Sequence, residues 1–204
     1  MTLHIKKLAT SPSRSGRHLQ RYNQGFRQVV GCVPYRIKAE KSAEIDEISI
    51  EDLEVLLISS QKSSRMMFPK GGWELDEDIG LAASRETLEE AGVVGLLGDK
   101  LGEWIFKSRS QEKQHEASMF SLLVKEELEV WPEKDVRHRV WMTIDEAREL
   151  CSHLWMKEAL EAFVRQFANG QTIKEESLAS CGFDELRLSI GEPSSDEEDC
   201  YLVR

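Results

Sequence analysis

The stretch from Glu74 to Glu90 constrains this chain more than any other, because it carries seven carboxylates within 17 residues. Like charges held this close repel one another unless a positive group lies against them. Gly71 and Gly72 precede the stretch and Gly92 follows it, which indicates a turn before a helix and a stop after it. We therefore interpret the stretch as a cation site, and the hypothesis is a divalent metal ion that holds a phosphate chain.

Residues 79–91 are expected to form the helix of this stretch, with Gly92 as the left-handed residue that ends it. At about 100° per residue, three carboxylates fall within an arc of about 100° on one side of the helix. They are Glu86, Glu89 and Glu90. Converging carboxylate oxygens, with space left for water and substrate, are the ligands that a hard cation such as Mg²⁺ requires. The alternative interpretation is a solvated helix face.

The small and large apolar residues of this helix are expected on opposite sides. Ala82 and Ala83 lie one turn before the carboxylates on the same side, where their short side chains leave room for a ligand. Leu81 and Leu88 fall on the other side, which we predict to face the core.

The remaining pattern predicts a mixed sheet with helices packed against it, because strands and helices do not alternate regularly. Apolar runs predict strands, "FPKGG" predicts a turn, and Thr143 with Glu146 predicts a capping box that opens a helix. Strands are predicted at 27–37, 53–60, 101–108 and 117–127, with a short one that starts at 139. One helix is predicted after Thr143 and a second at 154–168, and residues 38–52 are predicted to be a solvated connection.

Length and composition indicate one domain with two extensions. The expected parts are a basic arm or targeting segment at 1–25, a catalytic domain at 26–168, and an acidic, disordered tail at 169–204 whose protein partner is unknown. The four cysteines form no C-x-x-C pair, which predicts reduced thiols in an intracellular protein. No apolar run is long enough to predict a membrane span.

The charge of the chain is unevenly distributed. The net charge is −10, yet the first 39 residues hold eight Lys or Arg and no acid. Overall acidity argues against DNA or RNA held on a broad basic surface, and leaves a small polyanion as the expected partner. The cytoplasm is the expected compartment, with the nucleus also open. The alternative is the mitochondrion, because an acid-free basic start is typical of transit peptides.

The acidic stretch resembles the signature of the Nudix hydrolases, G-x5-E-x7-R-E-U-x-E-E-x-G-U, where U is a bulky aliphatic residue. The one departure is Thr87, where an aliphatic residue is usual. The matching residues are Gly71, Glu77, Arg85, Glu86, Glu89, Glu90, Gly92 and Val93. The resemblance implies an α/β fold, an α/β/α sandwich with a mixed β-sheet, over about 26–168, and hydrolysis of a diphosphate linked to another group.

The resemblance also implies a role for each residue of the signature. Glu86 and Glu90 are expected to bind Mg²⁺, or Mn²⁺, together with a backbone carbonyl of the Lys70–Gly71 turn. Glu89 is expected to be a further ligand or the base that deprotonates the attacking water. Arg85, counted with Glu86 and Glu89 among the catalytic residues, is expected to hold the carboxylates through an ion pair with Glu77. Gly71, Glu77 and Gly92 are the structural residues of the motif.

Segments outside the signature are similar to the diphosphoinositol polyphosphate phosphohydrolase branch of the family, and to its plant members especially. They include "GFRQVVGCVPYR", "FPKGGWE", "VKEELEVWPE" and "RHRVWMTIDEA". The resemblance implies hydrolysis of diphosphoinositol polyphosphates and of dinucleoside polyphosphates. The expected phosphate-binding cations are Arg27, Lys62, Arg65, Lys70 and Arg137, each of which could instead be a solvated surface charge.

Two alternatives stay open at this point. One is hydrolysis of other nucleoside diphosphate derivatives, such as ADP-ribose, NADH or capped RNA. The other is a sensor that binds a phosphorylated ligand without turnover.

Overall fold

The structure, a computed structural model, describes residues 13–14, 16, 18–38, 48–61, 63–107 and 114–170. The predicted tail beyond residue 170, most of the predicted arm and Lys62 lie outside these residues. The three-part division of the chain stays a prediction.

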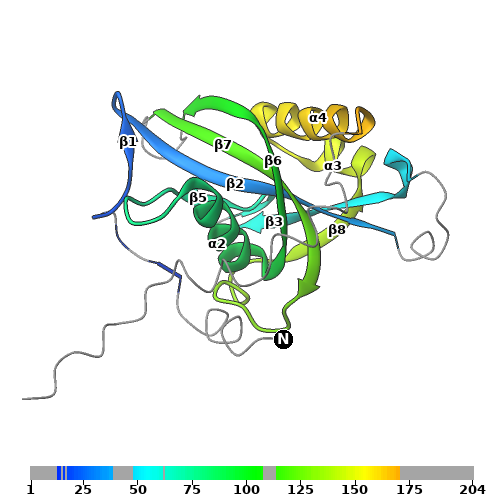
Figure 1. Cartoon of the computed structure of the whole chain (residues 1–204). Helices are drawn as coiled ribbons and strands as arrows, with labels where there is room; N and C mark the ends of the chain where they lie inside the picture. The colour runs from blue at the N-terminus through cyan, green and yellow to red at the C-terminus, as the bar shows by residue number, and fades with distance from the viewer. Residues whose placement is uncertain are drawn as a thin grey trace, which may run out of the picture. The chain divides into compact units, whose positions relative to one another are not determined.

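One mixed sheet forms the centre of the molecule (Figure 1). Its main strand order is β4-β3-β2-β7-β6, β1 and β5 also pair with β2, and β8 pairs with β3. β2 and β7 run parallel, whereas the other pairs are antiparallel. The strands are β1 (Tyr22–Asn23), β2 (Phe26–Ile37), β3 (Leu53–Ser60), β4 (Ser63–Met67), β5 (Lys70–Gly72), β6 (Val93–Lys107), β7 (Gln114–Glu127) and β8 (Arg139–Thr143).

Helices cover both faces of this sheet (Figure 1). The helical elements are a short 3-10 turn η1 (Ile50–Asp52) and the helices α2 (Ile79–Ala91), α3 (Ile144–Leu150) and α4 (Leu154–Ala168). The larger core lies where α3 and α4 pack on the sheet, and it includes Leu57, Phe68, Met156 and Phe163. A smaller core joins α2 to β2 and β7. The structure therefore has the mixed sheet that the pattern predicted and the layers of the α/β/α sandwich that the resemblance implied.

Most predicted elements are confirmed. β2 and β3 pair as adjacent strands, and Thr143 and Glu146 form the capping box that opens α3. Gly92 ends α2 with a φ of 64°, in the left-handed region where glycine is favoured. The prediction of a turn over residues 68–72 is wrong in part, because Lys70–Gly72 form strand β5 on β2. The backbones of β2 and of the segment at Pro69 approach each other closely, because a Cβ on Gly31 would lie 2.3 Å from the Pro69 carbonyl oxygen.

Candidate active site

Helix α2 presents its acidic side to the protein interior. Asp78 caps its start by accepting a hydrogen bond of 2.9 Å from the Leu81 N–H. Six of its side chains are buried, namely those of Ala82, Ala83, Thr87, Glu89, Glu90 and Ala91. The prediction that Leu81 and Leu88 face the core is wrong, since both are only half-buried. Small side chains let α2 approach the sheet closely, so the carboxylates turn inward with them.

Thr87, the one departure from the family signature, is accommodated without an unsatisfied group. Its side chain is completely buried, and its hydroxyl donates a hydrogen bond of 2.8 Å to the Ala83 carbonyl within the helix. A hydroxyl that bonds the preceding turn satisfies its own polarity. The position therefore keeps the helix intact.

Glu86 lies directly against the glycine strand. A Cβ built on Gly71 would stand 1.9 Å from Oε2 of Glu86, which is far inside van der Waals contact. Only a residue without a side chain lets this carboxylate reach the backbone of β5. The structure thus brings together Glu86 and the Lys70–Gly71 segment, which the family resemblance assigned, with Glu90, to one metal ion.

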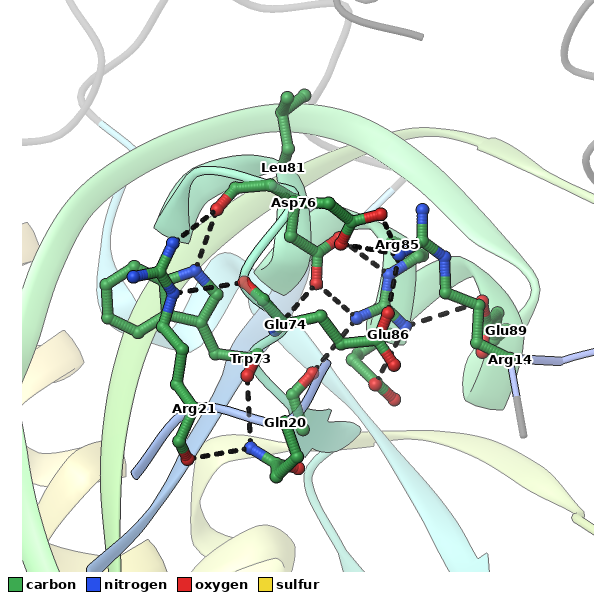
Figure 2. Close-up of polar contacts among 12 residues, drawn as sticks. Arg14, Gln20, Arg21, Trp73, Glu74, Asp76, Leu81, Arg85, Glu86 and Glu89 are labelled. Atoms are coloured by element: carbon green, nitrogen blue, oxygen red, sulfur yellow. Dashed lines mark hydrogen bonds and ion pairs between the residues drawn. The ribbon is translucent and has the colours of Figure 1, made fainter. Parts of the chain in front are cut away.

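Arg85 ties the acids of the site to one another (Figure 2). Its Nε and Nη2 contact the two carboxylate oxygens of Glu77 at 2.8 and 2.6 Å. Its Nη1 contacts Glu86 Oε1 at 2.8 Å and Glu89 Oε1 at 3.5 Å, while Nη2 also donates to the Gly72 carbonyl at 3.0 Å. A guanidinium held by a bidentate carboxylate is rigid. The predicted Arg85–Glu77 pair is present, and it fixes the positions of Glu86 and Glu89.

Glu90 is held on both oxygens. Its Oε2 accepts the Lys70 backbone N–H at 2.8 Å, and its Oε1 forms an ion pair with Nη2 of Arg137. Arg137 is itself buried, and it also contacts Glu133 at 2.5 Å and the Ser59 carbonyl at 3.1 Å. Arg137 therefore lies inside the carboxylate site and not on an open surface.

Burial raises the pKa of the Glu86, Glu89 and Glu90 carboxyl groups. It raises the pKa of Glu89 to about 7, and the neighbouring charge of Glu86 adds to the effect. It likewise raises the pKa of Glu90 to about 7, against the opposing influence of Lys70 and Arg137. The pKa of Glu86 is also raised, with burial as the main cause. Such acids gain from a nearby cation, because a positive charge relieves both desolvation and mutual repulsion.

The predicted phosphate-binding cations do not gather as one group. Arg27 lies beside Gly72, with its Nε donating to Gln20 Oε1 at 2.6 Å. Arg65 is exposed on β4. Lys70 is close to Glu90, and burial lowers the pKa of its ammonium group. Among the described cations that the sequence proposed, Lys70 and Arg137 are the ones that reach the carboxylates.

Sequence reasoning missed two residues that border the site. Glu133 accepts hydrogen bonds from Arg137 and from Gln61, and its charge contributes to the raised pKa of Glu86. Arg14 contacts Glu74 at 2.5 Å. The segment "VKEELEVWPE" signalled Glu133 only through its resemblance to the family branch, and no local pattern signalled Arg14.

Comparison with known proteins decides the family. The model of the NUDIX domain matches residues 43–164, which is more than half of the chain. The chain belongs to the Nudix hydrolases. It is therefore a hydrolase that acts on pyrophosphate bonds, as the resemblance of the acidic stretch implied.

Two relatives and one solved structure are similar to this Nudix hydrolase. "Nudix hydrolase 17, mitochondrial" of Arabidopsis thaliana is 50% identical over 183 residues, covering 89% of this chain and 98% of that protein. "Diphosphoinositol polyphosphate phosphohydrolase 3-beta" of Bos taurus is 35% identical over 127 residues, covering 61% and 68%. The crystal structure of a C. elegans Ap4A hydrolase complex has a TM-score of 0.53 at 22% identity, covering 70% of this chain and 98% of that one. The last likeness shows the fold alone.

The three carboxylates fit a hard divalent cation by their chemistry. They supply mutually repelling oxygen donors, of which Glu89 and Glu90 are buried and Glu86 lies against the backbone of Gly71. In the described part of the chain, no three His, Cys, Asp or Glu side chains already form a chelating group. Each of the three acids instead contacts a cationic side chain, Arg85 or Arg137.

No helix in the described residues has the length and apolar character that a membrane crossing requires.

Proposed function

We propose that this Nudix hydrolase cleaves a phosphoanhydride bond in diphosphoinositol polyphosphates and in dinucleoside polyphosphates, with Mg²⁺ or Mn²⁺ as cofactor. The observation that carries the proposal is the complete set of acids, with Glu77, Glu86 and Glu89 joined by Arg85 and Glu90 held by Arg137, which favours turnover over a sensor that only binds. The substrate class is supported by the name of the Bos taurus relative and by the branch segments of the sequence.

Each residue of the site has a proposed role that follows from its position. Glu86 and Glu90, with the Gly71 carbonyl, would hold the metal ion, and Glu89 would bind it or take the proton of the attacking water. A bound Mg²⁺ supplies charge neutralisation at the phosphate oxygens and lowers the pKa of bound water. Arg85 holds the carboxylates of Glu86 and Glu89 in fixed positions, so the site needs less reorganisation when substrate binds.

Substrate binding is assigned to the cations around these acids. Lys70 donates its backbone N–H to Glu90, and burial lowers the pKa of its ammonium group, which an incoming phosphate would stabilise. Arg27 and Arg65 lie on β2 and β4, where they can contact the outer phosphates of a large polyanion. Arg137 and Lys62 complete the proposed set. Arg137 would have to share its guanidinium between Glu90 and a phosphate.

One substrate panel tests the proposal. The full chain is assayed with Mg²⁺ on a diphosphoinositol pentakisphosphate, a diadenosine polyphosphate, ADP-ribose, NADH and capped RNA, with Glu89→Gln as the inactive match. We expect the first two to give the highest kcat/KM. A preference for ADP-ribose, NADH or capped RNA by orders of magnitude would refute the substrate assignment. Binding without hydrolysis of any compound would favour a sensor.

The proposed compartment is the mitochondrion, the alternative that the acid-free first 39 residues raised. The name of the Arabidopsis thaliana relative supports it. Imaging of the full chain with a fluorescent protein at its C-terminus, beside a mitochondrial marker, tests this. A diffuse cytoplasmic and nuclear signal would restore the first expectation.

A further inference from the structure

A short piece of the N-terminal arm lies across the carboxylate site. Ser13 and Arg14 contact residues from three separate segments, all acidic and all at or beside the proposed catalytic groups. Figure 2 shows Arg14 between Asp76 and Glu89. The function proposed above gives these two residues no role.

The Arg14 side chain binds the acids before α2. Its Nη1 contacts Glu74 Oε2 at 2.5 Å and the two oxygens of Asp76 at 3.1 and 3.2 Å. Neither acid belongs to the family signature. Arg14 is 42% exposed, so these ion pairs are of the kind that contribute little and weaken with salt.

The Arg14 backbone and the Ser13 side chain contact acids that lie deeper in the site. The Arg14 backbone N–H forms a hydrogen bond that lowers the pKa of Glu89, the proposed base or metal ligand. The Ser13 hydroxyl donates to Glu133 Oε1 at 3.3 Å, next to the Arg137 that holds Glu90. This segment therefore occupies polar atoms at two acids of the site itself.

The chain just after these residues is firmly attached. The Arg21 N–H donates to the Trp73 carbonyl at 2.9 Å, and the Leu75 N–H donates to the Leu19 carbonyl at 2.7 Å. The Arg21 guanidinium also stacks over the Trp73 ring at 4.3 Å. Ser13 and Arg14 are thus tethered beside the site whether or not their own contacts are made.

We infer that Ser13 and Arg14 form an autoinhibitory strap, which must leave Glu89 and Glu133 before a polyphosphate substrate can bind. The inference rests on the proposed function, since it concerns access to the same carboxylates. A protein that binds its ligand only in the open state has an apparent affinity reduced by the open fraction. The strap therefore raises KM and leaves kcat nearly unchanged.

The test compares full-length Arg14→Gln with the wild type and with Arg148→Gln. Arg148 is a matched control, because it is 37% exposed and also pairs with two acids, Asp145 and Glu161, both at 2.6 Å. Arg14→Gln should lower KM by about 3- to 10-fold at low salt, the range that one or two exposed ion pairs allow. The difference should shrink in about 0.5 M NaCl, because salt screens these pairs. Arg148→Gln should leave KM unchanged.

Two further measurements do not depend on turnover. In the Arg14→Gln variant, the backbone amides at positions 13 and 14 should exchange hydrogen faster than in the wild type, and a Mn²⁺ titration followed by EPR should show tighter Mn²⁺ binding. A raised KM would overturn the inference and make Arg14 a substrate contact, and unchanged KM with unchanged exchange would overturn it too. If neither protein hydrolyses any pyrophosphate, the proposed function fails, and the exchange and Mn²⁺ measurements still decide whether the strap exists.

Substitutions of Ser13 test the strap independently, through its contact with Glu133. In Ser13→Asp a carboxylate replaces the hydroxyl that faces Glu133, and like charges should open the strap. KM should then fall as in Arg14→Gln, whereas Ser13→Ala should have a smaller effect. An increase of KM in Ser13→Asp would contradict the inference.

Discussion

Glu89→Gln should make this protein more stable while it removes activity. Burial and the charge of Glu86 raise the pKa of Glu89 from 4.5 to about 7 in the folded chain. Between these two pH values the unfolded chain binds fewer protons than the folded one, so stability is lost as pH rises through this window. Above pH 7 the folded protein therefore carries the full cost of an ionised Glu89.

The size of this cost follows from the pKa difference. A change from 4.5 to about 7 corresponds to about 3 kcal/mol. Glu89 is not fully enclosed, and screening by solvent reduces the cost to about 1–2 kcal/mol. Its ion pair with Arg85, at 3.5 Å, is long, and Arg85 keeps its bidentate contact with Glu77. For a domain of this size, about 1–2 kcal/mol corresponds to a rise in Tm of about 4 °C.

The assay is thermal unfolding with EDTA present, at pH 8 and at pH 5, beside steady-state turnover with Mg²⁺. At pH 8 Glu89→Gln should melt about 4 °C above the wild type, and the gap should narrow at pH 5, where wild-type Glu89 is protonated. Turnover should fall by a factor of at least about 10². Glu158→Gln, on the exposed side of α4, should change neither quantity. A Glu89→Gln variant that melts at or below the wild type at pH 8 would refute the reasoning.

Three other substitutions test the contacts around the site. Gly71→Ala places a Cβ at 1.9 Å from Glu86, so we expect loss of at least about 10² in kcat and weaker Mn²⁺ binding measured by EPR. Arg137→Gln leaves Glu90 buried without its charged partner and should cost about 3–5 kcal/mol in urea unfolding at pH 8, and less near pH 5, where Glu90 is protonated. Gly92→Ala forces a side chain onto a φ of 64° and should cost at least about 1 kcal/mol in the same unfolding measurement, with full helix content by circular dichroism.

Local signals in the sequence predicted the elements that carry the site. The spacing of Glu86, Glu89 and Glu90 on one side of a helix follows from helical geometry, and the stop at Gly92 follows from the left-handed conformation that glycine can adopt. The side of α2 that faces the sheet did not follow, because hydrophobicity pointed to Leu81 whereas close packing selected the alanines. Close packing depends on the partner strand, which the helix sequence does not contain.

Contacts between distant segments were the other part that the sequence could not provide. The positions of Arg137 and Glu133 depend on the loop before β8 meeting α2, and Arg14 reaches Glu74 across 60 residues. Of the basic residues expected near the acids, Lys70 and Arg137 reach the carboxylates in the described residues, whereas Arg65 is exposed, and which of them would be buried depends on tertiary packing. Their pairing is a property of the folded chain.

The tether at Trp73 has a practical consequence for anyone who prepares this protein. Under the strap proposed above, a purification tag, a fusion partner or a trimmed start changes the segment that covers Glu89 and Glu133, and with it the access of a polyanionic substrate to the site. Two laboratories with different expression vectors would then measure different apparent affinities for one enzyme, and the discrepancy would be greatest in dilute buffer.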